Sequence, residues 1–437
     1  MNSKHPKALP ILFLTEMWER FSYYGMRALL VLYAVKFLGF SDRSAGQLYG
    51  AYTGLVYLTP ILGGWLSDQF LGLRRSILLG GILMGLGHLS LAFEEIEFFF
   101  LGLFLLVLGN GFFKPNMSSL VGSLYENNDS LRDSGYTIFY MGINLGGFFG
   151  PIICGTLGEK MDWHYGFGAA GIGMGIGVLV FYFGQKLLPS HIGIKPQKKK
   201  EFNPRARQLT QVEWNHIKTI LVLSFFSIFF WAAFEQAGSS MNLFADRYVD
   251  RSIGEWQIPA SLFQSVNPVF ILLFAPLFAK MWTSLARRNK EPDKPVKFAF
   301  GLLLLSAGFF CLVLGARQIA EEGFAGMHFL LLAYLFNTLG ELCLSPVGLS
   351  MVSELAPTHL TSLMMGIWFL SNAVAHYLGG VFSGMVSEIS LRIFFGVFVV
   401  MAVCSAVLLL LIRPILNSWM KEKNPVQNVW LWLDNQL

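Results

Sequence analysis

The sequence predicts an all-α protein that crosses a membrane many times, and three observations support this prediction. Only 14% of the 437 residues are charged and 54% are hydrophobic, whereas about 25% of residues are charged in soluble domains. Apolar stretches of about 20 residues, the length that crosses a bilayer, recur along the whole chain. The 45 glycines and 41 phenylalanines are typical of membrane helices whose backbones approach closely. The composition excludes a soluble enzyme, a disulfide scaffold and a disordered chain.

Twelve apolar segments fall into two sets of six. The first set covers approximately residues 10–38, 45–65, 76–93, 98–120, 135–157 and 165–187, and the second covers 217–243, 258–282, 296–315, 328–349, 361–386 and 391–416. No small-residue cleavage site follows a short apolar core near the N-terminus, so the first segment is predicted to be a transmembrane helix and not a signal peptide. We therefore predict an N-terminal six-helix bundle (1–188), a basic cytoplasmic linker (189–216), a C-terminal six-helix bundle (217–416) and a cytoplasmic tail (417–437).

Basic residues in the connections predict which side of the membrane each loop faces. Residues 186–218 hold eight basic and two acidic side chains, and residues 280–297 hold six basic and two acidic ones. Cytoplasmic loops carry such an excess of lysine and arginine. Both termini are therefore predicted to face the cytoplasm, in a multi-pass plasma-membrane protein.

Six helices, a basic linker and six more helices resemble the plan of the major facilitator superfamily, whose substrate site lies between the two halves near the bilayer midplane. Asp68, Arg74 and Arg75, which follow the second segment, resemble the loop motif of that superfamily. The resemblance implies the major facilitator superfamily fold, with 12 transmembrane helices in two six-helix bundles. It does not indicate the substrate.

Seven ionisable side chains lie well inside the apolar segments. They are Glu16, Glu19, Arg20, Arg27, Lys114, Glu235 and Glu341. Each costs roughly 2.5–3.5 kcal/mol to insert, so such residues usually mark function. Structural ion pairs that fix helix positions are the alternative. The spread over segments 1, 4, 7 and 10, which hold corresponding positions of a three-plus-three repeat, favours a shared central cavity.

The first segment carries its polar residues on one face. They are Glu16, Glu19, Arg20, Tyr23, Tyr24 and Arg27. At about 100° per residue they fall within an arc of roughly 140°. A charged face cannot meet lipid, so we expect it to line a wet cavity.

The charges in the middle of the chain suit a ligand with two poles. Arg27 and Lys114 can hold a carboxylate, the arginine as a fork and the lysine as a point charge, and Glu235 and Glu341 can hold an ammonium group or a proton. The seven charges sum to −1 (four acidic, three basic), and a cavity of low dielectric favours the uptake of one proton to cancel the excess.

Neutral side chains add hydrogen-bonding groups and walls to this site. Asn144 and Asn267 offer donors and acceptors that suit peptide amides. The candidate wall residues are Tyr23, Tyr24, Tyr57, Trp231 and Trp368, which are apolar with polar tips. Together these groups predict a site for a short zwitterion.

Five motifs resemble those of the proton-dependent oligopeptide transporter family. They are EMWERFSYY at 16–24, GNGFFKPN at 109–116, FYMGINLG at 139–146, FEQAGSS at 234–240 and ELCLSP at 341–346. The resemblance covers nearly the whole chain. It implies proton-coupled symport of di- and tripeptides, and of peptidomimetics, into the cell by alternating access. It also implies a secondary transporter and not an enzyme, with the proton as coupling ion and no other cofactor or metal. The expected partners are the peptide, the proton and the lipid bilayer, with no nucleic acid. The protein is expected to work as a monomer in the bacterial inner membrane.

The resemblance also implies a role for each matching residue. Glu16, Glu19 and Arg20 would couple transport to protons. Arg27 and Lys114 would bind the peptide carboxylate, and Glu341, Asn144 and Asn267 its amino terminus. Arg27 with Glu235 would form an outer gating pair, and Lys114 with Glu341 an inner one. Tyr23, Tyr24, Tyr57, Trp231 and Trp368 would line the binding site.

Two departures from the family and two alternatives limit this interpretation. The linker is too short for the two extra helices of many bacterial members, and the second segment lacks the histidine of animal members, so proton coupling would rest on carboxylates. His88 and His376 are predicted to be packed residues without a chemical role. The alternatives are a transporter of another anion or small zwitterion and a non-transporting receptor or scaffold.

Overall fold

The computed structural model describes residues 5–125, 129–194, 209–357 and 360–421. It is almost entirely helical, which confirms the predicted all-α fold. Twelve of its helices have 18 or more residues. Eight spans among the described residues are long and apolar enough to cross a membrane by composition. Helix α1 is not among them because four charged side chains interrupt its apolar sequence.

The first bundle contains α1 to α7. Their bounds are α1 Leu9–Lys36, α2 Asp42–Leu66, α3 Leu73–Ser90, α4 Ile96–Ser123, α5 Asp129–Gly150, α6 Thr156–Lys160 and α7 Trp163–Gly184. Helix α2 runs into the π-helical turn η1 (Ser67–Leu71), which ends at Gly72 with φ 77°. A second π-helical turn, η2 (Pro151–Gly155), joins α5 to α6, and the 3-10 turn η3 (Gln185–Leu187) follows α7.

The second bundle contains α8 to α14. Its helices and 3-10 turns are α8 Gln211–Phe234, η4 Glu235–Gly238, α9 Ser240–Tyr248, η5 Ala260–Ser265, α10 Val266–Arg287, α11 Lys294–Glu322, α12 Met327–Leu355, α13 Thr361–Ser383 and α14 Leu391–Lys421. Thr210 and Glu213 form a reciprocal capping box that starts α8. Two short strand pairs lie near the start of α10: β1 (Val249–Asp250) pairs in parallel with β4 (Ala325–Gly326), and β2 (Ser252–Ile253) pairs antiparallel with β3 (Trp256–Gln257).

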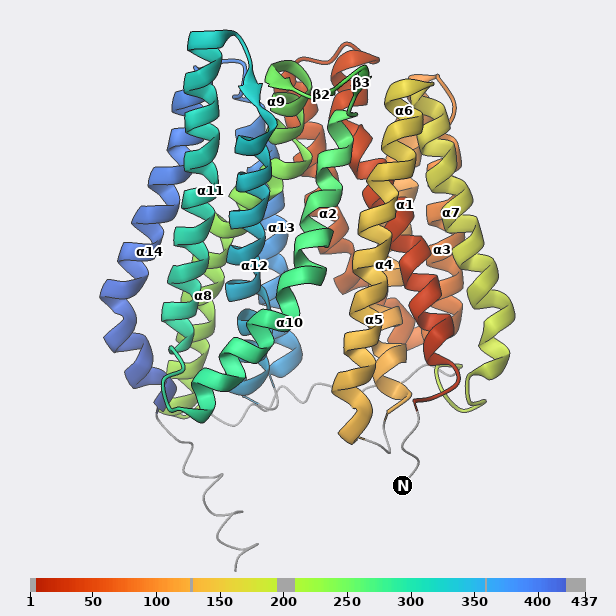
Figure 1. Ribbon diagram of the computed structural model, residues 1–437. Helices are drawn as coiled ribbons and strands as arrows, with labels where there is room; N and C mark the ends of the chain where they lie inside the picture. Colours follow the sequence, from red (N-terminus) through yellow and green to blue (C-terminus); the bar gives the residue numbers. More distant parts are fainter. Residues whose placement is uncertain (1–4, 126–128, 195–208, 358–359, 422–437) are drawn as a thin grey trace, which may run out of the picture.

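Each half packs mainly on itself. Helix α1 packs on α5 and α7, and α3 on α4, whereas α11 packs on α12 and α14, and α8 on α13. The two bundles stand side by side, and α1 begins and α14 ends at the same end of the molecule (Figure 1). The exact domain bounds stay a prediction. Residues 195–208 of the linker and 422–437 of the tail lie outside the described residues.

The loop after α2 anchors the beginning of the predicted linker. The Arg74 guanidinium donates hydrogen bonds to the backbone carbonyls of Gln185, Pro189 and Ile192. The Arg74 amide donates to the carbonyl of Gly193 at 3.0 Å. This arginine of the superfamily loop motif therefore holds the end of its own bundle and the start of the predicted linker.

The bundles touch most closely where α2 crosses α13. A Cβ atom at Gly380 would lie 2.3 Å from Gly50 Cα and 2.4 Å from the Gly46 carbonyl oxygen. Only glycine fits at such a backbone contact, because ordinary van der Waals contact of a Cβ atom begins near 3.4 Å. These glycines therefore permit the two bundles to seal against each other along the first half of α2.

Polar contacts between the bundles gather at the end where α1 ends and α2 begins, which we call the sealed end (upper end in Figure 1). Among the described residues three ion pairs cross there: Lys36–Asp246 at 2.9 Å, Asp42–Arg247 at 2.6 Å and Arg43–Glu388 at 3.5 Å. The carboxylate of Glu159 on α6 accepts the backbone N–H groups of Ala260 and Ser261, at 2.9 and 2.7 Å. It thereby caps the first turn of η5 from the other bundle.

Candidate functional site

A cavity of about 320 Å³ lies between the two bundles, a size that suits a small organic ligand. Ten of the predicted site residues line it: Tyr24, Arg27, Tyr57, Lys114, Asn144, Trp231, Glu235, Asn267, Glu341 and Trp368. They come from α1, α2, α4 and α5 of the first bundle and from α8, η4, α10, α12 and α13 of the second. Residues up to 344 positions apart in the chain thus meet around one cavity, as expected from the sequence.

Glu16, Glu19, Arg20 and Tyr23 lie outside the lining of this cavity, buried against neighbouring helices. Arg20 Nη2 donates to Glu19 Oε1 at 2.8 Å, and Arg20 Nε lies 3.2 Å from Glu16 Oε1. The same guanidinium lies 5.2 Å from the centre of the Tyr23 ring. The expectation that the whole polar face of α1 lines a wet cavity is wrong for these four residues. One guanidinium contacts both carboxylates inside the protein, which accounts for their burial away from the cavity.

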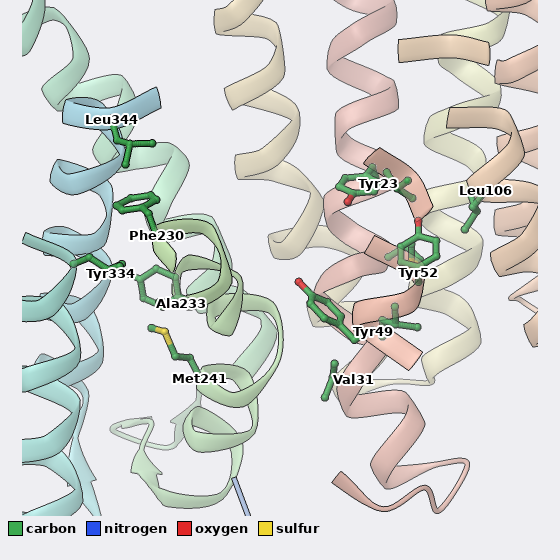
Figure 2. Packing of buried hydrophobic residues seen from close by; sticks show 14 of the residues in the cluster. Tyr23, Val31, Tyr49, Tyr52, Leu106, Phe230, Ala233, Met241, Tyr334 and Leu344 are labelled. Atoms are coloured by element: carbon green, nitrogen blue, oxygen red, sulfur yellow. The ribbon is translucent and has the colours of Figure 1, made fainter. Parts of the chain in front are cut away.

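The predicted pair of Arg27 and Glu235 is formed and joins the bundles. Arg27 Nη2 lies 3.2 Å from Glu235 Oε2. Tyr49 of α2 connects the two groups, because its hydroxyl accepts a hydrogen bond from Arg27 Nε at 2.8 Å and donates one to Glu235 Oε2 at 2.8 Å. The Tyr49 hydroxyl points from the first bundle towards the second (Figure 2). Both sides of this pair are buried, so it closes the cavity towards the sealed end.

Lys114 and Glu341 have other partners. Lys114 Nζ lies 4.2 Å from the centre of the Tyr57 ring, a cation–π contact. Glu341 Oε2 accepts a hydrogen bond from Asn267 Nδ2 at 3.0 Å. Within the described part of the chain no ion pair joins Lys114 to Glu341, and the inner gating pair stays a prediction.

The charges of the cavity are divided between the bundles. Both cations, Arg27 and Lys114, come from the first bundle, and both carboxylates, Glu235 and Glu341, come from the second. A ligand with one negative and one positive end can therefore contact both bundles at once. Such a ligand favours the bundle arrangement in which its two poles reach their partners.

Several lining residues were not predicted from the sequence. They include Tyr140, Gln264, Tyr334, Asn337, Ser345 and Asn372. Trp231 Nε1 and Asn372 Oδ1 are buried without a hydrogen-bond partner among the described residues. Position 372 follows Trp368 by one helical turn, and His376, which lies beside Glu235, follows it by another. This four-residue spacing was a usable signal for both residues.

Two helical bundles around a central cavity with buried charges define a secondary transporter of the major facilitator type. The POT family model matches residues 74–220 and 194–401. The chain is 34% identical to the peptide transporter YePEPT of Yersinia enterocolitica, with 94% of each protein covered. It is 31% identical to a di-/tripeptide transporter of Lactococcus lactis, with 94% of this chain and 96% of the relative covered.

Solved structures agree with these relatives. The peptide transporter POT in complex with sulfate superposes with a TM-score of 0.90, at 33% identity and 97% coverage of both chains. A mutant of a peptide transporter POT in complex with alafosfalin superposes with 0.89, at 34% identity and with 97% of both chains covered. The chain therefore belongs to the POT family, which confirms the resemblance of its motifs. Its relatives are transporters, so the protein is a membrane transporter and not an enzyme.

Proposed function

We propose that the protein carries di- and tripeptides into the cell by proton-coupled symport, through alternating access. The observation that carries this proposal is the division of charge across the cavity. The cations of the first bundle suit the carboxylate of a peptide, and the carboxylates of the second suit its ammonium group. The peptide-transporting relatives from Yersinia and Lactococcus support this substrate class, and the alafosfalin complex supports peptidomimetics as further ligands.

The Glu16–Glu19–Arg20 cluster is the proposed site of proton coupling. It buries two carboxylates against one guanidinium, which leaves an excess of one negative charge. Burying an uncompensated charge is costly, so the cluster favours the uptake of one proton. Lys114, which faces the cavity, also interacts electrostatically with both carboxylates. A peptide carboxylate that binds Lys114 thus changes the charge balance around the proton site.

The cavity and the sealed end support alternating access. The pair of Arg27 and Glu235 and the glycine contacts of α2 close one end of the cavity, while Lys114 and Glu341 are unpaired with each other. The described parts of the basic connections, 186–194, 209–218 and 280–297, lie at the opposite end, with the start of α1. We assign that end to the cytoplasm, and the structure then corresponds to a state that is closed outside. The bacterial inner membrane, function as a monomer and the domain bounds 1–188 and 217–416 belong to the same proposal.

Uptake of labelled dialanine into proteoliposomes tests the function. With an inward proton gradient the purified protein should accumulate dialanine above equilibrium, and a protonophore should abolish the accumulation. Glu19→Gln should lose accumulation but keep exchange of dialanine without a gradient. Accumulation by Glu19→Gln would remove this residue from the coupling mechanism. Exchange without any response to the gradient would refute coupling, and no movement of dialanine would refute the substrate.

A further inference from the structure

A buried histidine stands beside the ion pair that joins the bundles. His376 on α13 is 2% exposed, and its Nδ1 lies 3.2 Å from Glu235 Oε2. Its ring packs against Tyr57 with the ring centres 4.3 Å apart. The sequence predicts a packed histidine without a chemical role, but contact with a buried carboxylate is a different environment. It gives the imidazole a direct influence on the contact between the bundles.

Three groups meet at a single oxygen atom. Glu235 Oε2 lies 2.8 Å from the Tyr49 hydroxyl, 3.2 Å from Arg27 Nη2 and 3.2 Å from His376 Nδ1. A carboxylate has about four lone-pair sites on its two oxygens, so about two donors saturate one oxygen. Tyr49 and Arg27 belong to the first bundle, whereas His376 belongs to the same bundle as Glu235. His376 Nδ1 makes no hydrogen bond to the described residues in the present arrangement. An imidazolium that donates to this oxygen would be a third strong donor and would compete with the partners from the other bundle.

The charged and titratable groups around His376 come from several helices. They are Glu235 of η4, Tyr49 and Tyr57 of α2, Arg27 of α1 beyond Glu235, Lys114 of α4 on the Tyr57 ring, and Glu341 of α12 across the cavity. Two cations and two carboxylates thus surround the imidazole. A peptide carboxylate bound to Arg27 and Lys114 offsets the two cations.

We propose that His376 is a second proton-binding residue, whose protonation transfers Glu235 from Arg27 of the other bundle to the imidazolium of its own. Histidine gains or loses its charge between about pH 5 and 8. With neutral His376, Glu235 binds Arg27 and the bundles stay joined at the sealed end. With protonated His376, Glu235 has a charged partner within its own bundle, and the sealed end opens more readily. The use of this opening in symport rests on the proposed function, but the opening itself does not.

Distance measurements between spin labels test the proposal without transport. Glu95 before α4 and Glu322 at the end of α11 are exposed residues at the sealed end, one on each bundle. Labels on cysteines at these positions, after replacement of the four native cysteines by alanine, report the separation of the bundles. His376→Asn places an amide nitrogen near the position of Nδ1 and takes up no proton. His328→Asn, on α12 near the sealed end, is the matched control.

The expected result is a several-fold rise in the population of long distances when the pH falls from 8 to 5, in the parent protein and in His328→Asn. His376→Asn should keep its pH 8 distribution. A response of His376→Asn equal to that of the parent, or a parent that does not respond, would overturn the proposal. If His376→Asn already differs at pH 8, His376→Gln replaces it. Dialanine exchange at pH 8 on both sides reports the proposed function separately, and its absence leaves the distance result valid.

Discussion

Substitution of Gly380 by alanine tests whether glycine contacts hold the bundles together at the sealed end. The new methyl group would lie 2.3 Å from Gly50 Cα, where ordinary contact begins near 3.4 Å, so the helices must separate by about 1 Å. Overpacking of this kind costs about 1–3 kcal/mol. The strain falls on the contact between the bundles and leaves the packing within each bundle intact. It should therefore raise the ratio of open to sealed molecules about 5- to 150-fold.

The Glu95–Glu322 label pair measures this ratio at constant pH. Gly366→Ala is the matched control on the same helix, because nothing lies within 4 Å of a Cβ atom at Gly366. The control should keep the parent distribution, while Gly380→Ala should shift it to longer distances. A Gly380→Ala protein with the parent distribution would refute the argument that this contact limits opening.

Three further predictions concern single side chains. Tyr49→Phe deprives Arg27 Nε and Glu235 Oε2 of one partner each, at about 1–3 kcal/mol per buried group. The ratio of sealed to open molecules in the labelled protein should fall about five-fold or more, and an unchanged ratio would argue against Tyr49 as a bridge. Glu341→Gln should raise the dialanine concentration for half-maximal exchange about ten-fold or more, because a charged hydrogen bond is lost; an unchanged concentration would exclude amine binding by Glu341. Although partial burial of Asp293 opposes ionisation, hydrogen bonds from Asn417 and Arg413 keep its pKa below the ordinary 3.8. Its stabilising contribution is therefore present at neutral pH and is lost as the pH falls through that lowered pKa. Asp293→Asn should lower the stability at pH 7 by about 1 kcal/mol or less. In thermal unfolding, the difference in stability between the variant and the parent protein should narrow below about pH 3.8. A difference that stays constant with pH would contradict this assignment.

Hydropathy predicted the helices well but not their interruptions. The segment predicted over 217–243 is broken where α8 ends at Phe234 and η4 begins. The break falls in the run EQAGSS at 235–240, whose polar and small residues favour a turn. Hydropathy averaged over a whole membrane span passes over so short a run. The turn also packs closely on the other bundle, because a Cβ atom at Gly238 would lie 2.1 Å from the Tyr49 hydroxyl oxygen.

The site was predictable where charges are involved and less so where they are not. Arg27, Lys114, Glu235 and Glu341 stand out because charged residues are rare in apolar helices, and the structure brings all four to one cavity. Tyr49, which is neutral, gave no comparable signal. The arc argument for α1 failed for Glu16, Glu19 and Arg20 because it weighed only lipid against water. It omitted the third environment, in which buried opposite charges satisfy one another.

The short turn η5 has a consequence for how a ligand is sensed. The Glu159 carboxylate of the other bundle accepts hydrogen bonds from the first turn of η5. Gln264, near the end of η5, lines the cavity, and Asn267, just beyond it, donates a hydrogen bond to Glu341. The turn that contacts the other bundle and part of the cavity wall thus belong to one continuous segment. Ligand binding at Asn267 and the contact of Glu159 with η5 are therefore coupled. By thermodynamic reciprocity, the Glu159 contact changes the affinity for the ligand by the same factor by which the ligand changes the equilibrium constant of the Glu159 contact. Substitutions at Glu159, which is half-buried and lies outside the cavity lining, should therefore change peptide affinity without contact with the peptide.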